Sequence, residues 1–226
     1  VLSIIEHNIH RLPRGKYPSV GIATFNIAQR NLIKSRCIER NKFEKFKEFN
    51  DKVQKLEEEG LLVKNLENIQ GDERDVIILS TTYGVNSDGK FNQRFGPINH
   101  QKGYKLLNVI VTRAKYKVYV CTSIPENVYL NYKDFLVTEG ENNKKAAFYT
   151  YLSYARAVSE VNQEARMAIL NDLAENSNLN QNEYEFNADL ESPFEEEVYE
   201  ALVSKFDQNK ITSHLQFAGF RIDLVY

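Results

Sequence analysis

The sequence has few residues that could hold a fold together covalently or place it in a membrane. Its 226 residues include two cysteines, Cys37 and Cys121, five prolines, one methionine and no tryptophan. Two cysteines without metal-ligand spacing exclude a disulfide framework and a cysteine-rich zinc site. No apolar run reaches the roughly 18 residues of a membrane-spanning helix, and no segment resembles a signal peptide. These absences favour a packed domain in the cytoplasm with no membrane partner.

Several catalytic signatures are also missing. The sequence contains no G-x-x-x-x-G-K-[ST] phosphate-binding loop, no glycine-rich dinucleotide fingerprint and no G-x-S-x-G nucleophile elbow. It begins with Val1 instead of methionine, which suggests a piece of a longer protein. Chemistry on a nucleoside triphosphate would therefore need residues from outside this piece.

Charge is distributed unevenly along the chain, although the formal net charge is only −2. Residues 1–125 carry 21 basic and 13 acidic side chains, a net of +8, and residues 126–226 carry 8 and 18, a net of −10. A basic first half is compatible with a phosphate-rich ligand such as nucleic acid. Two differently solvated surfaces would explain the same counts equally well.

Short apolar runs alternate with helical patterns in the first half of the chain. Buried strands are predicted at 20–24, 61–63, 76–79 and 118–121, and helices at 1–11, after a cap at Asn26, at 43–56 and at 104–114. A long polar loop is predicted from about Tyr83 to Gly103. Strands that are apolar on both faces and alternate with helices predict an α/β fold, a parallel sheet flanked by helices.

The pattern changes after Pro125. A helix is predicted at about 146–173, an asparagine-rich polar linker at 176–187, and then a short helix and a hairpin. We therefore divide the chain into a domain at 1–125, a helical extension and linker at 126–187, and a final segment at 188–226.

Three segments place polar residues at the junction of a strand and a helix. They are V-G-I-A-T-F-N-I-A-Q-R at 20–30, V-K-N-L-E-N-I-Q-G-D-E-R-D-V-I-I-L-S at 63–80, and L-L-N-V-I-V-T-R-A-K at 106–115. Because ligands gather at the carboxyl ends of the strands in parallel sheets, Thr24, residues 65–73 and residues 112–113 are candidates for one or more shared edges. Each segment alone is a weak signal.

Together and in this order, the three segments resemble motifs IV, V and VI of superfamily 1 helicases. The resemblance covers about residues 1–124 and is closest to the branch that contains the nonsense-mediated-decay helicase. It implies a second RecA-like domain. ATP and Mg²⁺ would bind between this domain and the first RecA-like domain of the same parent chain. The parent would be an ATP-dependent helicase or translocase, and this fragment alone would be inactive.

The resemblance also implies roles for single residues. Arg113 matches an arginine finger that reaches the γ-phosphate, and Arg30 matches a second arginine that approaches the phosphates. Gly71 would permit close approach of the backbone to the nucleotide, Glu73 would contact the ribose hydroxyl, and Gln70 would support that turn. A surface cation or a structural ion pair remains the alternative for each charged residue.

Nucleic acid would lie across the opposite edge of the sheet, against Thr24, Asn65 and Asn68. The sequence departs from the family here, because the family has threonine where Asn65 stands and often T-P-Y where this chain has T-F-N. Asparagine can still donate a hydrogen bond to phosphate. A cap or turn role is the alternative for all three residues.

The final segment carries a second resemblance. S-P-F-E at 192–195 and G-F-R-I-D-L at 219–224 resemble the opening of a very-short-patch-repair-like nuclease of the PD-(D/E)XK class. The resemblance implies that Glu195 and Asp223 help to bind a catalytic divalent metal, in a site that this truncated segment leaves incomplete. A fused nuclease favours DNA over RNA as the partner. An ordinary acidic helix with a hairpin is the alternative.

Two other functions stay open at this point. The chain could belong to a non-catalytic module that binds nucleic acid or protein and has kept only the fold. It could also belong to a defence or restriction nuclease whose helicase part only scans. Residues of motif type at Glu73 and Arg113 favour a working ATPase parent over the binding module.

Overall fold

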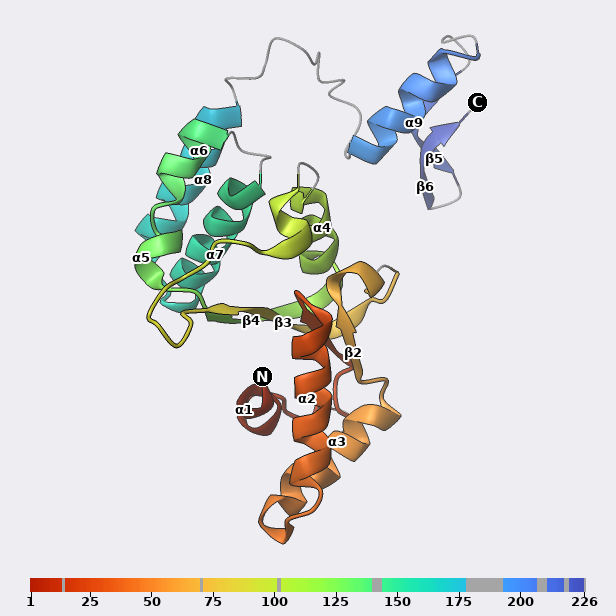
Figure 1. The fold of residues 1–226 in the computed structure, drawn as a ribbon. Coiled ribbons are helices and arrows are strands. Elements are labelled where there is room, and N and C mark those ends of the chain that lie inside the picture. The colour runs from red at the N-terminus through yellow and green to blue at the C-terminus, as the bar shows by residue number, and fades with distance from the viewer. Residues whose placement is uncertain are drawn as a thin grey trace. The chain divides into compact units, whose positions relative to one another are not determined.

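Four parallel strands in the order β2-β1-β3-β4 form the sheet around which the first part of the chain folds (Figure 1). They are β1 (Val20–Thr24), β2 (Leu62–Asn65), β3 (Arg74–Gly84) and β4 (Ala114–Ser123). All three strand pairs are parallel. The α/β fold predicted from the alternation of strands and helices is thereby confirmed.

This structure is a computed structural model that describes residues 1–13, 15–69, 71–100, 103–139, 144–177, 193–206, 211–217 and 220–225. These residues fall into two compact units, Val1–Ser177 and Asn178–Tyr226, and each is described by itself.

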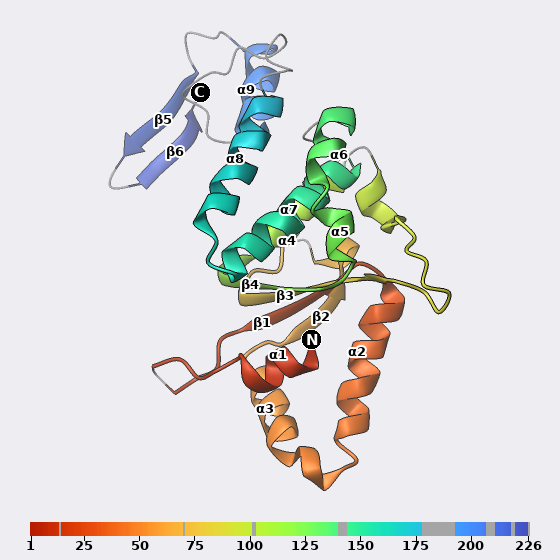
Figure 2. The same cartoon turned by 90° about the vertical axis from the view of Figure 1, so that its left-hand side faces the viewer.

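Helices cover both faces of the sheet (Figure 1, Figure 2). On one face lie α1 (Leu2–His7), α2 (Ile27–Arg40), the 3-10 turn η1 (Glu44–Phe46) and α3 (Lys47–Glu58). The other face is covered by η2 (Leu66–Asn68), η3 (Gly96–Asn99), α4 (Gly103–Val111), α5 (Glu126–Tyr129), α6 (Tyr132–Glu139), α7 (Lys144–Ser159) and α8 (Gln163–Ser177).

The central strands are buried on both sides because successive side chains of a strand point to opposite faces. Ile78 of β3 packs with the core beneath α1–α3, and its neighbours Ile77 and Leu79 pack with the core beneath α4–α8. All three side chains are fully buried. This explains why these strands read as continuous apolar runs in the sequence.

Asn26 caps α2 as predicted. Its Oδ1 accepts a hydrogen bond of 2.8 Å from the backbone N–H of Gln29, which would otherwise lack a partner in the first helical turn. We expect Asn26→Ala to lower the free energy of unfolding by about 1 kcal/mol. Denaturant titration of the chain measures this loss. Ser35→Ala, on the exposed middle of α2, is the matched control and should change stability little.

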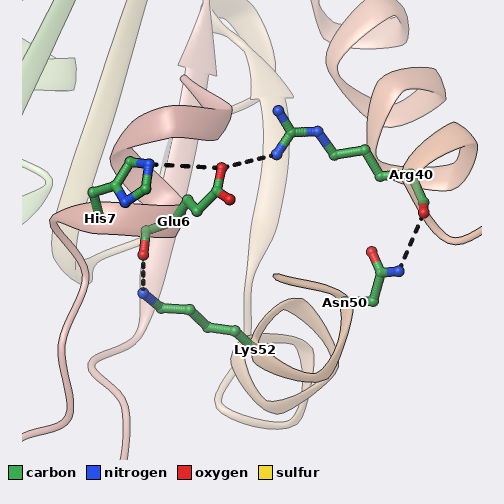
Figure 3. A network of polar contacts seen from close by, with 5 residues as sticks. All are labelled: Glu6, His7, Arg40, Asn50 and Lys52. Carbon is green, nitrogen blue, oxygen red and sulfur yellow. Dashed lines mark hydrogen bonds and ion pairs between the residues drawn. The ribbon is translucent and has the colours of Figure 1, made fainter. Parts of the chain in front are cut away.

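A polar network joins the three helices on the α1–α3 face (Figure 3). The guanidinium of Arg40 pairs with the carboxylate of Glu6 at 3.1 Å and lies 4.6 Å from the ring centre of Phe49. Lys52 donates to the main-chain oxygen of Glu6 at 2.8 Å, and Asn50 donates to that of Arg40 at 3.2 Å. Burial lowers the pKa of Lys52. These contacts link α1 to α2 and α3 in addition to the apolar core.

The polar loop predicted from Tyr83 to Gly103 is partly wrong. Strand β3 continues to Gly84, and a β-bridge pairs Val85 with Phe91. Phe95 is fully buried, with its ring centre 5.1 Å from that of Phe148 on α7. The many turn residues in this segment predicted a polar loop. The aromatic side chains among them are buried or half-buried because of contacts with distant segments, which a local sequence pattern does not show.

The single helix predicted at 146–173 is two helices, α7 and α8. They are separated at residues 160–162, where Val161 has a φ of 56° and Asn162 caps α8 by accepting from the N–H of Ala165 at 3.0 Å. The short helices α5 and α6 were not predicted. The hydroxyl of Tyr132 on α6 donates to the carboxylate of Asp172 on α8 at 2.6 Å, and this hydrogen bond links α6 to α8.

The second unit contains one helix and one hairpin among its described residues. Helix α9 (Pro193–Val203) lies against β6 (Phe220–Val225), which pairs in antiparallel fashion with β5 (Thr212–Phe217). The predicted short helix and hairpin are present.

Candidate functional site

All four strands run in the same direction, so their carboxyl ends form one edge of the sheet and their amino ends form the opposite edge. The candidate residues are divided between these two edges. At the carboxyl edge, Thr24 of β1 pairs with Asn65 of β2 and Ser80 of β3. At the amino edge, Arg74 of β3 pairs with Ala114 of β4. The sheet therefore separates Thr24 and Asn65 from Glu73 and Arg113, which adjoin Arg74 and Ala114 in sequence.

The amino edge brings Glu73 and Arg113 together. The N–H of Arg74 donates to the main-chain oxygen of Arg113 at 3.0 Å, so the residues that bear the two candidate side chains are neighbours across β3 and β4. Glu73 is exposed. Arg113 is half-buried where α4 ends, and its Nε donates to the main-chain oxygen of Val109 at 3.0 Å. Within the described residues, no carboxylate pairs with its guanidinium.

The loop at 66–73 links the two edges. It leaves the carboxyl end of β2, packs Leu66 and Ile69 into the core beneath α4, and returns to the amino end of β3. Lys64 and Asp72 form an ion pair of 2.5 Å across it. The hydrogen bond from Lys64 lowers the pKa of the Asp72 carboxyl.

Gly71 serves this loop through its backbone conformation. Its φ is 85°, in the left-handed region that favours glycine, and a Cβ placed there would meet no atom within 4 Å. The space beside it is therefore open, as a site for a ligand would need. Gln70, the preceding candidate, lies outside the described residues.

A pair of side chains fixes the start of the two central strands. The N–H and the hydroxyl of Ser19 both donate to one carboxylate oxygen of Asp75 at 2.8 Å, and the N–H of Asp75 donates back to the hydroxyl at 3.0 Å. Asp75 lies in the motif segment at 63–80, and the sequence had suggested no role for it. The one signal in the sequence was that Asp75 lies within a motif but has no ligand assigned to it, which is typical of a structural residue.

The carboxyl edge presents less to a ligand than the sequence suggested. Thr24 is fully buried, and its hydroxyl donates to the main-chain oxygen of Asn26 at 2.9 Å. Asn65 is 3% exposed, and its Oδ1 accepts from Asn68 at 2.7 Å. Of the three predicted contacts only Asn68 is exposed, so Thr24 and Asn65 shape this edge from within.

Backbone strain marks the same edge. Thr82 has a φ of 70°, which is unusual for a β-branched residue, and the β3–β4 register shifts between Ser80 and Gly84. Gln29 of α2 donates to the hydroxyl of Ser80 at 3.3 Å. Such outliers cluster at functional sites, but no sequence pattern pointed to Thr82.

Arg30 stands apart from Arg113. It lies in the first turn of α2, which begins at the carboxyl end of β1 and packs on the α1–α3 face. Its guanidinium donates to the side chain of Asn31 at 3.0 and 3.2 Å. In this structure Arg30 and Arg113 do not converge, since they belong to opposite edges and to different helical layers.

The predicted metal residues lie on α9 and β6, which are neighbours in the second unit. The side chains of Glu195 and Asp223 are outside the described part of the structure. Among the side chains that are described, no group of three or more histidine, cysteine, aspartate or glutamate residues could hold a metal ion. No helix in the described ranges is both long and apolar enough to span a bilayer.

Comparison with known proteins defines the class to which this fold and its motifs belong. Residues 1–124 match the AAA_12 family, described as an AAA domain, and the chain belongs to this family. The match supports the resemblance to the C-terminal domain of superfamily 1 helicases over the same residues.

Two individual proteins are similar over a shorter range. The chain is 42% identical over 103 residues to the uncharacterized ATP-dependent helicase MG140 of Mycoplasma genitalium, and 43% identical over 103 residues to its homolog in Mycoplasma pneumoniae. Each match covers 44% of this chain and 8% of the relative. The chain thus corresponds to a small part of these relatives. No solved structure matches.

Proposed function

We propose that residues 1–125 are the second RecA-like domain of an ATP-dependent helicase or translocase. The observation that carries this proposal is the amino edge, where one backbone hydrogen bond makes neighbours of Glu73 and Arg113. The family match and two relatives named as ATP-dependent helicases support it. The ATP site would be completed by the first RecA-like domain of the same parent chain.

Arg113 is suited to act on the phosphates. Its Nε is fixed by the main chain of Val109, and no described carboxylate neutralises its charge. A guanidinium held in this way stabilises the charge that develops on the phosphoryl oxygens during transfer. Lysine cannot offer the same planar fork of donors.

The other residues at this edge fit a nucleotide as well. The exposed carboxylate of Glu73 can accept a hydrogen bond from a ribose hydroxyl, and the open space beside Gly71 allows backbone approach. We assign Gln70 to support of the same turn and Arg30 to a second phosphate contact, which would require movement from its present position. Bound Mg²⁺ would supply charge neutralisation at the phosphates, with its protein ligands on the partner domain.

We place nucleic acid at the carboxyl edge. Asn68 would contact the phosphate backbone directly, and Thr24 and Asn65 would hold the edge in shape through their buried hydrogen bonds. The preference for DNA over RNA rests only on the nuclease-like second unit. Backbone contacts of this kind position a strand and do not read its sequence.

An ATPase assay tests the two-domain site. The isolated chain should hydrolyse no ATP, with or without single-stranded DNA, because its sequence contains no phosphate-binding loop. The parent protein should hydrolyse ATP under the same conditions. Turnover that stays with the isolated chain through successive purification steps would contradict the proposal.

The isolated chain should bind single-stranded DNA weakly, with an affinity that falls as salt rises, because each phosphate contact releases a counterion. Fluorescence titration at two salt concentrations measures this dependence. Asn68→Asp should weaken binding severalfold, because it adds a negative charge at the exposed position of the carboxyl edge. Asn41→Asp, at the far end of α2, is the matched control. An affinity that does not change with salt, or that falls equally in both variants, would favour a protein partner.

A nuclease is a second candidate function, for residues 188–226 with the rest of their domain. It is supported by the packing of α9, which carries Glu195, against β6, which carries Asp223. If both carboxylates face the same side of this packing, they could bind a divalent metal and orient water toward a phosphodiester. We propose residues 126–187 as the helical extension and linker between the two functions.

A further inference from the structure

Arg74 crosses the amino edge of the sheet. Its side chain leaves β3, and its Nε donates to the main-chain oxygen of Gly60, in the turn before β2, at 2.8 Å. Its Nη1 donates to the main-chain oxygen of Glu73 at 2.7 Å, and its N–H donates to that of Arg113, just before β4, at 3.0 Å. One residue therefore holds the segments that carry both candidate nucleotide contacts.

One glycine leaves room for this crossing, and a second lies at ordinary contact distance from it. A Cβ on Gly21 of β1 would lie 3.2 Å from Cγ of Arg74, and a Cβ on Gly60 would lie 3.9 Å from its Nε and Nη2. The arginine stem passes over β1 at the first glycine and reaches the turn at the second. Gly60 also has a φ of 90°, which the turn after α3 requires.

The regular ladder does not fix this region by itself. The register of β3 with β4 shifts between Arg74 and Val76, so the pairing at the amino edge is irregular. The side-chain bonds of Arg74 add a constraint at that point. A planar guanidinium donates along several fixed directions, and lysine has a single ammonium that cannot reproduce this geometry.

We propose that Arg74 is a positioning residue for the nucleotide site. It fixes the backbone of Glu73 through its guanidinium and the backbone of Arg113 through its N–H, and so holds the ribose-binding and phosphate-binding side chains in one arrangement. This inference rests on the proposed function. It adds a residue that touches no nucleotide itself and acts through both residues that do.

The test uses the parent helicase with Arg74→Lys, which keeps the charge and the main-chain N–H but loses the fork. We expect kcat/KM for ATP to fall between about tenfold and a hundredfold, because small displacements of Glu73 are costly. The kcat should change less, because lysine keeps the main-chain N–H that holds Arg113. We also expect the ratio of kcat/KM for ATP to that for 2′-deoxy-ATP and 3′-deoxy-ATP to move toward one, because Glu73 is no longer held. Arg36→Lys, at an exposed position on α2, is the matched control.

The turnover of Arg113→Ala and the melting temperature of each variant are measured in the same experiment. If Arg113→Ala keeps wild-type turnover, the proposed function fails. If Arg113→Ala loses turnover but Arg74→Lys keeps wild-type kcat/KM and ribose discrimination, the positioning role is wrong. If Arg74→Lys only lowers the melting temperature, and activity per folded molecule with its ribose discrimination is unchanged, Arg74 is structural and the inference is again overturned.

Discussion

Replacing Arg113 by alanine in the parent helicase should lower kcat for ATP hydrolysis by roughly 10³-fold or more, with a smaller change in ATP binding. The reason is that the guanidinium meets the largest negative charge in the transition state, not in the bound substrate. Steady-state kinetics and a separate nucleotide-binding titration measure the two effects independently.

Three variants sharpen this result. Arg113→Lys should recover part of the loss, because it restores the charge without the planar fork. Arg30→Ala should lower turnover more mildly. Lys115→Ala, two positions after Arg113 and exposed, should turn over like the wild type. If Arg113→Ala retains wild-type turnover, the half-buried arginine is a structural residue that closes the end of α4.

Removing the carboxylate of Asp223 should abolish metal-dependent DNA cleavage in a protein that carries the whole nuclease-like domain. With Asp223→Asn one proposed metal ligand loses its charge, and a hard cation such as Mg²⁺ depends on charged oxygen ligands. A supercoiled-plasmid nicking assay with Mg²⁺ or Mn²⁺ measures the loss. Glu195→Gln should behave alike.

Glu200→Gln is the control for this experiment, since Glu200 lies on the same helix α9 and is exposed. It should leave cleavage intact. A protein that never cuts DNA with either metal, or that cuts equally well after Asp223→Asn, would make residues 188–226 a structural appendage.

The sheet could be predicted because its strands are buried on both faces. Ile77 and Ile78 point in opposite directions and both lie in cores, so the sequence shows an unbroken apolar run. The cap at Asn26 could also be predicted, because its local hydrogen bond demands a particular residue type.

What could not be predicted depends on contacts between distant segments. The burial of Phe95 could not be predicted, because two of its ring partners, Phe148 and Tyr149, lie on the distant helix α7. The contact between Arg113 and Arg74 could not be predicted from sequence either, because it depends on the order of the strands. Motif spacing thus identified candidate residues, whereas the hydrogen bonds of Arg74 became visible only in three dimensions.

The contact between Phe25 and Phe148 cannot form until late in synthesis on the ribosome. The ring of Phe25, at the end of β1, lies 5.1 Å from that of Phe148 on α7, and the two residues are 123 positions apart in the chain. At about 5–20 residues per second, roughly 6 to 25 s pass between their translation. Until α7 has been made, the elements from η2 to α6 can cover only part of this apolar face of the sheet. The residues matched by the family thus complete their core only after the helices beyond them have been made.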